Sequence, residues 1–123
     1  MAEDEPSTFR ASMRRVPSPV VVVTARGPQE ARGITIGSFS SVALDPPLVS
    51  FNVGRDASMF EVMEHCDRFA VHVLGENQAH LAEQFAIPGL SGAEQFEAVP
   101  HERDAHGTPI LEGGSGVLHC RPH

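Results

Sequence analysis

The sequence predicts a mainly β protein with short helices, in which an antiparallel sheet forms a small barrel with helices on its outside. The prediction rests on three observations. Residues 20–24 are four valines and a threonine, and β-branched side chains favour strands. Residues 25–32 are polar and include Gly27 and Pro28, so they predict a hairpin-length loop into a second strand. The later strands lack the regular alternation with helices that is typical of a parallel sheet.

The remaining elements follow from local sequence, in chain order. The predicted strands are residues 34–42, 48–53, 69–74 and a last one starting near Gly116. The predicted helices are residues 7–16, residues 58–66, one capped by Asn77 that carries Leu81 and Phe85, and a helical turn at 93–96. Asp45, Pro46 and Pro47 predict an extended turn, because each proline fixes its own φ and restricts the residue before it.

The length of 123 residues predicts a single domain. We expect residues 1–8 to be a disordered start and residues 9–123 to form the domain. The first residues, MAEDEPSTF, are acidic and polar, unlike a signal peptide. No apolar run in the sequence approaches the roughly 18 residues that a membrane-spanning helix needs. We therefore expect a cytoplasmic protein with no membrane partner.

Charge and side-chain chemistry argue against several other classes of protein. The net charge is −7, lysine is missing from the sequence and the arginines are scattered, so we expect no nucleic-acid partner. Cys66 and Cys120 lack the spacing of a disulfide framework or a zinc site, which predicts two reduced, half-buried thiols. The seven histidines do not form two ligand pairs, so we expect no metal. In the apolar segment 69–74, His72 is expected as a neutral imidazole making one hydrogen bond.

The predicted strand 34–42 is rich in small and hydroxyl side chains. One face carries Ile34, Ile36, Ser38, Ser40 and Val42, and the other carries Thr35, Gly37, Phe39, Ser41 and Ala43. Small residues let another body approach the backbone closely, and hydroxyls donate and accept hydrogen bonds. The pattern suits a planar, partly apolar ligand with a polar rim and a phosphate tail. From the pattern alone, a strand that merely faces solvent is the favoured interpretation, because serine-rich strands are common.

The same segment carries a resemblance to a known family. Thr35 to Pro47, TIGSFSSVALDPP, resembles the central motif of the flavin reductase-like family, the FMN-binding split barrels. The resemblance extends in order along the chain and covers roughly residues 9–120. The further similar segments are 9–23, 55–60, FAVHVL at 69–74, LAEQFA at 81–86 and 109–113. The resemblance implies an antiparallel split β-barrel of the FMN-binding type.

The resemblance also implies a cofactor site. Family members hold FMN or FAD in a cleft at a homodimer interface. By this resemblance the flavin ring edge and ribityl chain contact Thr35, Ile36, Gly37, Ser38, Phe39, Ser40 and Ser41. Arg55 and Ser58 meet the phosphate, and we expect Ser58 to cap a helix whose free N–H groups and dipole favour an anion. Ala57, Met59 and His72 depart from the residues that many members carry, which predicts fewer phosphate contacts.

The activity implied by the resemblance is NAD(P)H-dependent flavin reduction, with hydride transferred from NADH or NADPH to FMN or FAD. The reduced flavin then serves a partner such as a monooxygenase. Since the cofactor performs the redox step, we assign no catalytic residue. Family members extend beyond the equivalent of His123, so the barrel is expected to be C-terminally short. Two alternatives therefore stay open: a non-catalytic flavin-binding or electron-carrier protein, and a structural dimerisation module.

Overall fold

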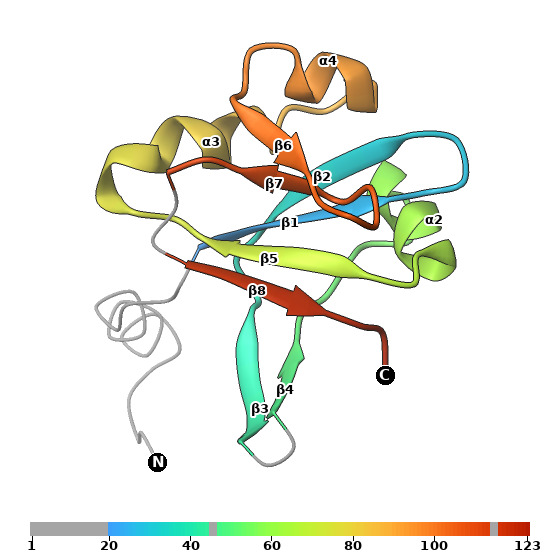
Figure 1. Ribbon diagram of the computed structural model, residues 1–123, viewed down its shortest axis with the longest axis vertical. Helices are drawn as coiled ribbons and strands as arrows, with labels where there is room; N and C mark the ends of the chain where they lie inside the picture. The colour runs from blue at the N-terminus through green and yellow to red at the C-terminus, as the bar shows by residue number, and fades with distance from the viewer. Residues whose placement is uncertain (1–19, 45–46, 114–115) are drawn as a thin grey trace, which may run out of the picture.

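The computed structural model describes residues 20–44, 47–113 and 116–123. The predicted helix at 7–16, the disordered start at 1–8 and the turn at Asp45 and Pro46 lie outside these residues. A four-stranded antiparallel sheet with the order β2-β1-β5-β8 forms the centre of the fold (Figure 1). Its strands are β1 (Val21–Arg26), β2 (Ala31–Ile36), β5 (Phe69–Val73) and β8 (Gly116–Cys120). The antiparallel, mainly β prediction is thus confirmed.

The central strand β1 is buried on both faces of the sheet. Val21, Val22, Val23, Thr24 and Ala25 are all fully inaccessible to solvent. Because alternate side chains of a strand point to opposite faces, the unbroken apolar run fits a strand covered on both sides. This explains why the valine run was the easiest element to predict from the sequence. β2 and β8 lie at the two edges of the sheet.

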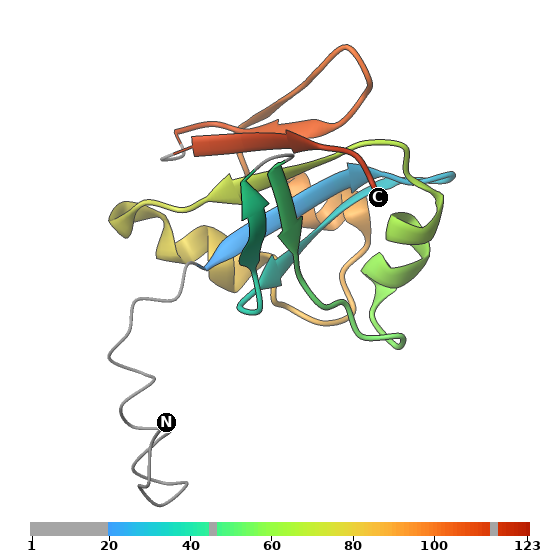
Figure 2. The same ribbon diagram turned by 90° about the horizontal axis from the view of Figure 1, so that it is seen from below.

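One face of the sheet is covered by α2 (Ser58–His65) and contacts the residues that flank the hairpin of β3 (Ser40–Leu44) and β4 (Pro47–Ser50). Met59, Val62 and the following Cys66 pack against Val21 and Val23 in one apolar cluster. Phe39 and Phe51, which flank the hairpin, pack against the same cluster. Figures 1 and 2 show the hairpin leaving the β2 end of the sheet and projecting away from it.

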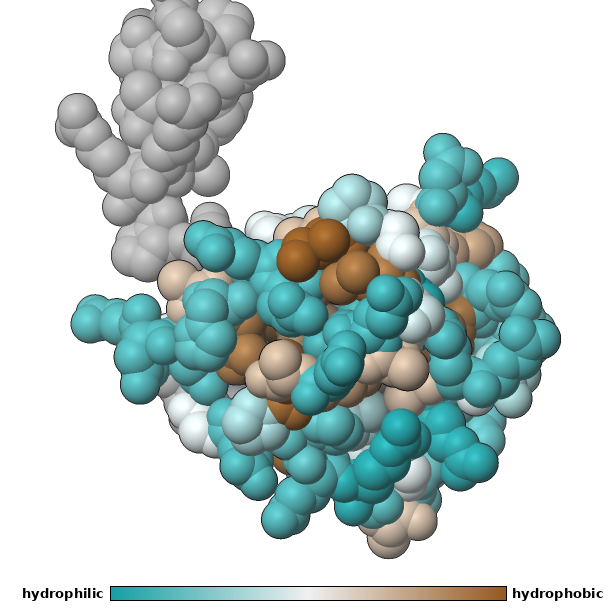
Figure 3. Space-filling model, turned by 90° about the horizontal axis from the view of Figure 1, so that it is seen from above, coloured by the Kyte–Doolittle hydropathy of each residue, from teal (hydrophilic) through white to brown (hydrophobic). Residues whose placement is uncertain are grey.

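The opposite face is covered by η1 (Glu76–Gln78), α3 (Ala79–Gln84), α4 (Gly92–Phe96) and the hairpin of β6 (His101–Arg103) and β7 (Pro109–Leu111). Leu81, Phe85 and Phe96 pack there against Val22. The outer surface over these elements is mostly hydrophilic, with small apolar patches between the polar residues (Figure 3). Their apolar side chains therefore serve mainly to cover the sheet.

Two buried polar side chains tie the β6–β7 hairpin to the sheet. His72 is 1% exposed and its ring makes two hydrogen bonds, one from Nδ1 to the Val22 carbonyl (3.0 Å) and one from the Leu111 N–H to Nε2 (3.1 Å). The expectation of a single bond was therefore wrong. Thr24 Oγ1 donates to the Pro109 carbonyl at 2.7 Å. Burial lowers the pKa of His72, so the ring is neutral and its Nε2 can accept.

The predicted strand 34–42 is wrong as a single element. The strand ends at Ile36, and the chain crosses Gly37, Ser38 and Phe39 before β3 begins in a different sheet. Ser38 Oγ accepts a hydrogen bond from the Asn52 N–H at 2.9 Å, so this side chain stabilises the crossing between the two elements. The two-face argument made for 34–42 therefore holds only up to Ile36.

Three further expectations need correction. β4 ends at Ser50, whereas the sequence predicted a strand to residue 53. Asn77 lies inside η1 and does not cap a helix, because the chain enters α3 through this short 3₁₀ turn. No strand was predicted between the helical turn at 93–96 and the last strand near Gly116, whereas the short strand β6 lies there, concealed by the low apolar content of residues 101–103. The helix at 58–65, the strand at 69–73 and the helical turn near 93–96 are confirmed.

Candidate functional site

A cavity of about 410 Å³ opens along the free edge of β2. Three parts of the chain form its walls: β2 itself, the start of α2 and the segment that follows α3. The lining residues are Arg32, Gly33, Ile34, Thr35, Asp56, Ala57, Ser58, Met59, Phe85, Ala86, Ile87, Pro88, Gly89 and Gln95. Its volume lies within the range of small-molecule and cofactor sites, about 300–1,000 Å³.

The floor of the cavity is the backbone edge of β2. In an antiparallel strand, alternate residues direct both N–H and C=O to the same side. The Gly33 N–H donates to Gln95 Oε1 (3.0 Å) and the Gly33 carbonyl accepts from Gln95 Nε2 (2.9 Å), so both groups point away from β1. By the same alternation the N–H and C=O of Thr35 point away from β1 as well. The Thr35 peptide groups thus offer one donor and one acceptor at the cavity.

The N-terminus of α2 forms the second wall. Ala57 is the N-cap residue, and its side chain makes no capping hydrogen bond. Ser58 is the first residue of the helix, so the prediction that Ser58 caps it was wrong by one position. The first N–H groups of a helix lack partners within the helix, and its dipole favours a negative charge nearby. Asp56 also lines this wall and works against that preference, because it places a carboxylate beside the helix start.

The third wall is apolar and approaches β2 closely. A Cβ on Gly33 would lie 2.7 Å from Phe85 Cδ1, so the glycine is what allows the ring to pack against the strand. Thr35 Oγ1 donates to the Ala82 carbonyl at 2.6 Å, which fixes α3 on the same side of β2. Ile87 is 45% exposed and continues this wall outward. The cavity therefore combines a polar strand edge with apolar walls.

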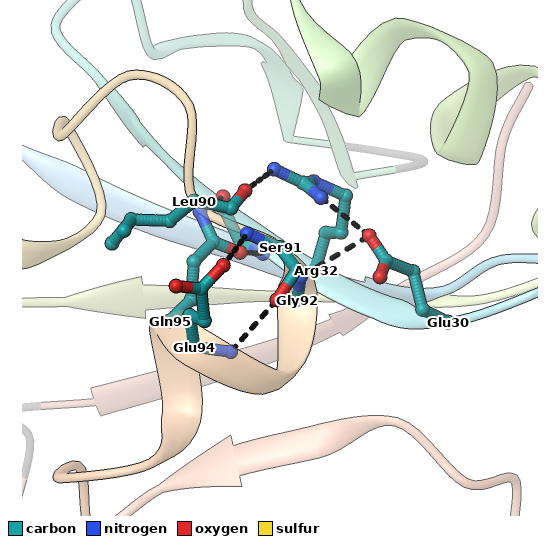
Figure 4. A network of polar contacts seen from close by, with 8 residues as sticks. Glu30, Arg32, Leu90, Ser91, Gly92, Glu94 and Gln95 are labelled. Carbon is teal, nitrogen blue, oxygen red and sulfur yellow. Dashed lines mark hydrogen bonds and ion pairs between the residues drawn. The ribbon is translucent and has the colours of Figure 1, made fainter.

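A polar network fastens the rim of the cavity to the β1–β2 hairpin (Figure 4). Arg32 forms an ion pair with Glu30 and donates to the Leu90 carbonyl. Glu30 Oε2 also accepts from the Gly92 N–H at 3.1 Å. Arg32 is therefore neutralised by its neighbour, and its structural role is to hold the segment 87–91 against β2.

The structure brings together only some of the nine predicted site residues. Thr35 and Ser58 line the same cavity from separate elements, although 23 positions separate them in the sequence. Ile36 is 4% exposed with its side chain in the core, and it does not line the cavity. Arg55 lies in the exposed turn immediately before the lining residues Asp56 to Met59.

The other five predicted residues lie beyond the end of β2, outside the lining of this cavity. These residues are Gly37, Ser38, Phe39, Ser40 and Ser41. Four of them are exposed, and Phe39 is half-buried against the core cluster under α2. Gly37, Ser38 and Phe39 connect β2 to β3, and Ser40 and Ser41 are the first residues of β3. Whether these five residues contact a flavin depends on what covers them, and their role stays a prediction.

Sequence reasoning missed several residues that shape the cavity. Gln95 and Gly33 meet across 62 positions, and no spacing in the sequence connects them. Arg32 was noted only as a scattered surface charge. Phe85 was predicted on a helix, but its contact with Gly33 depends on how α3 lies on the sheet. Gly33, two residues before the motif, was the one local signal that a bulky group approaches β2.

Other polar and titratable groups lie elsewhere in the fold. A larger cavity of about 550 Å³ is lined by Arg26, His65, Arg68 and His106 among others, and it contains none of the nine predicted residues. Cys66 and Cys120 are both free thiols, as predicted, but Cys66 is buried and only Cys120 is half-buried; burial raises the pKa of each. Among the described residues no three His, Cys, Asp or Glu side chains are placed to share a metal ion. Every helix in that part of the chain is too short or too polar to cross a membrane.

Comparison with known proteins identifies the family. The model of the flavin reductase-like domain matches residues 13–123, and the chain belongs to this family. An NADH:FMN oxidoreductase of Rhodococcus qingshengii is 40% identical over 114 residues, which are 93% of this chain and 55% of that protein. The chain thus spans about half the length of this curated relative.

Solved structures show the same fold. The NADH:FAD oxidoreductase of Streptomyces globisporus C-1027, solved in complex with NAD and FAD fragments, is 38% identical with a TM-score of 0.79. The match covers 99% of this chain and 74% of that one. The flavin reductase component of a bacterial two-component tryptophan halogenase is 30% identical with a TM-score of 0.77, covering 95% of this chain and 74% of its own. The predicted split-barrel fold class is therefore confirmed.

The residues around the cavity fit a flavin. An isoalloxazine ring is planar and apolar on its faces, with donors and acceptors along one edge, and the cavity provides apolar walls and the donor–acceptor pair of Thr35. A flavin phosphate fits the positive end of the helix dipole at the start of α2. Asp56 is the one lining group that opposes a phosphate. To a flavin held here the lining residues would contribute binding and orientation.

Proposed function

We propose that this protein is an NAD(P)H-dependent flavin reductase, which binds FMN or FAD at the β2 edge and receives hydride from NADH or NADPH. The single observation that carries the proposal is the cavity at the edge of β2, which Thr35 and Ser58 line from separate elements. It is supported by the family and by relatives named as NADH:FMN and NADH:FAD oxidoreductases. When bound, the flavin supplies the redox chemistry by accepting a hydride at N5.

The chain contributes binding and orientation. The Thr35 N–H and C=O hold the polar rim of the ring, and Phe85 and Ile87 contact its apolar surface. Ser58 and the N-terminus of α2 bind the phosphate, with Arg55 adding a positive charge from the preceding turn. A ring held against an apolar wall is shielded from water on that side, which leaves the opposite face for the nicotinamide. No side chain acts as an acid or base in this proposal.

We further propose a homodimer in which a second copy covers the surface of Gly37, Ser38, Ser40 and Ser41. Val42 lies on the same hairpin and is 61% exposed, so a second copy on this surface would bury an apolar side chain. In this arrangement the predicted residues outside the cavity line the flavin from the dimer interface. Sedimentation velocity gives the mass directly: a dimer supports the arrangement, and a monomer at micromolar concentration contradicts it.

A partner that uses reduced flavin, such as a monooxygenase, completes the proposed function. One solved relative is the flavin reductase component of a two-component halogenase, which supports such a pairing. Because NADH and NADPH are cytoplasmic reductants, we place the protein in the cytoplasm. We take residues 9–123 as the domain that carries the activity.

Three measurements on purified protein test the proposal. NADH or NADPH oxidation that depends on added FMN or FAD supports a flavin reductase. Bound flavin visible by absorbance, with no nicotinamide oxidation above that of free flavin, supports instead the flavin-binding or electron-carrier alternative. A protein that binds no flavin at all leaves only the structural dimerisation module. The chain tested includes residues 1–123, with a longer chain as a control where the natural protein extends further.

A further inference from the structure

Gln95 is a buried amide that pairs with a strand edge. It is 3% exposed, and it makes both of its hydrogen bonds to the backbone of one residue, Gly33. A neighbouring antiparallel strand would make the same two bonds, one from its C=O and one from its N–H. Figure 4 shows Gln95 on α4, beside the polar contacts that join this helix to β2. The Gln95 amide thus makes the two hydrogen bonds that the N–H and C=O of one residue on a neighbouring strand would make.

The close contact of α4 with β2 is what lets Gln95 reach Gly33. A Cβ on Gly92 would lie 2.0 Å from the Ala31 carbonyl oxygen, so the first turn of α4 rests directly on the strand backbone. Gly92 and Gln95 are three positions apart and share one face of the helix. The Gly92 N–H also donates to Glu30 Oε2 (3.1 Å), which anchors the same end of α4 to the hairpin.

We propose that Gln95 is a positioning residue for the flavin, an inference that rests on the proposed function. By pairing with Gly33, Gln95 closes the edge of β2 at that residue and leaves the next outward-facing pair, at Thr35, for the ligand. It also holds the strand at a fixed distance from α4, so the Thr35 N–H and C=O are aligned before the flavin arrives. Groups aligned in advance bind more tightly because less ordering is needed on binding.

Gln78 provides a matched control. It is 5% exposed and also bonds two backbone groups, accepting from the Gly75 N–H (2.8 Å) and donating to the Glu112 carbonyl (3.4 Å). It does not line the cavity. Gln78→Met and Gln95→Met remove the same amide and keep a similar volume, so both variants lose stability for the same reason.

The test compares FMN affinity and stability in these two variants. FMN affinity is measured by quenching of flavin fluorescence, at a temperature where urea titrations show both variants folded. We expect both substitutions to lower the urea midpoint, but only Gln95→Met to weaken FMN binding, by about tenfold against less than about twofold for Gln78→Met. Equal losses of FMN affinity in the two variants, or an unchanged affinity in Gln95→Met, overturn the inference.

A second measurement keeps the result distinct from failure of the proposed function. If the unsubstituted protein binds no flavin, the proposed function fails, and amide hydrogen exchange without ligand then decides the role of Gln95. We expect Gln95→Met to accelerate exchange at Ile34 and Ile36, which face β1, more than at Val71 in the centre of the sheet. Gln78→Met is expected to leave this difference unchanged. Uniform exchange in Gln95→Met contradicts the positioning role.

Discussion

Substitution of Gly33 by alanine tests how closely α3 packs against β2. The added Cβ would lie 2.7 Å from Phe85 Cδ1 and 2.8 Å from Cε1, whereas carbon atoms in contact prefer about 3.5–4.0 Å. The ring must therefore move by roughly 0.8 Å or more to restore ordinary contact. Phe85 is 3% exposed and its ring centroid lies 5.2 Å from that of Phe96, so it moves against packed side chains.

The expected loss of stability follows from two opposing effects. Overpacking a core by one methyl group costs about 1–3 kcal/mol. Replacing glycine also reduces the freedom of the unfolded chain, which contributes about 0.4–1 kcal/mol in favour of folding. The free energy of unfolding of Gly33→Ala should thus fall by about 1–2 kcal/mol. Gly116→Ala is the matched control, since a Cβ there meets no atom within 4 Å, and it should be neutral or slightly stabilising.

A double-mutant cycle measured by urea unfolding assigns the effect to the ring. Phe85→Leu removes Cε1 and replaces the rigid ring by a smaller side chain that can turn away from the new Cβ, so the double variant should lose about 1 kcal/mol less than the sum of the two single losses. Full additivity, or a Gly33→Ala protein as stable as the original, would show that the ring does not pack against Gly33. The description of the third wall of the cavity would then be incorrect.

Three further outcomes follow from buried and capping contacts. Because burial holds the pKa of His72 below its ordinary value of 6.5, the unfolded chain takes up the proton first. The free energy of unfolding should therefore fall as pH drops below about 6.5 toward the pKa of His72 in the folded protein. The urea midpoint of His72→Gln should depend less on pH over that range than the midpoint of the unsubstituted protein. An equal pH dependence in the two proteins contradicts the assignment to His72. Thr24→Val leaves the buried Pro109 carbonyl without its 2.7 Å partner and should cost about 1–3 kcal/mol in urea unfolding, whereas no loss would show that this bond is dispensable. Ser91→Ala removes the cap that accepts from the Glu94 N–H at 3.1 Å and should cost about 1 kcal/mol, measured as a lower melting temperature; an unchanged value contradicts the cap.

The elements most readily predicted from the sequence are those whose own residues are almost all apolar. The valine run of β1 and the apolar segment of β5 are buried on both sides, so composition alone identifies them. The end of β2 at Ile36 was not predictable in the same way, since glycine and serine, the residue types at positions 37 and 38, also occur within strands. There the deciding factor is a contact across the fold, between Ser38 and the Asn52 N–H.

In the candidate site, too, some residues were predictable from the sequence and others depend on long-range contacts. Thr35 and Ser58 were predicted through the family motif, and the fold brings them to one cavity. Gln95 and Phe85 lie 62 and 52 positions from Gly33, and their contacts with it depend on how α3 and α4 lie on the sheet. Whether the outward N–H and C=O groups of a strand are free depends on the strand order of the sheet, because in a central strand the same residues would be hydrogen-bonded on both sides. Residue patterns thus indicated the ligand class, and the three-dimensional packing defined the cavity.

The central claim is that a flavin binds along the β2 edge, between that strand and the start of α2. Residue-resolved amide exchange with and without saturating FMN tests it most directly. We predict slower exchange at Thr35 and at Ser58 and Met59 when FMN is present, with no change at Arg26 and Arg68 in the larger cavity. Protection confined to the larger cavity, or no protection at Thr35 when FMN is shown to be bound, would contradict the claim.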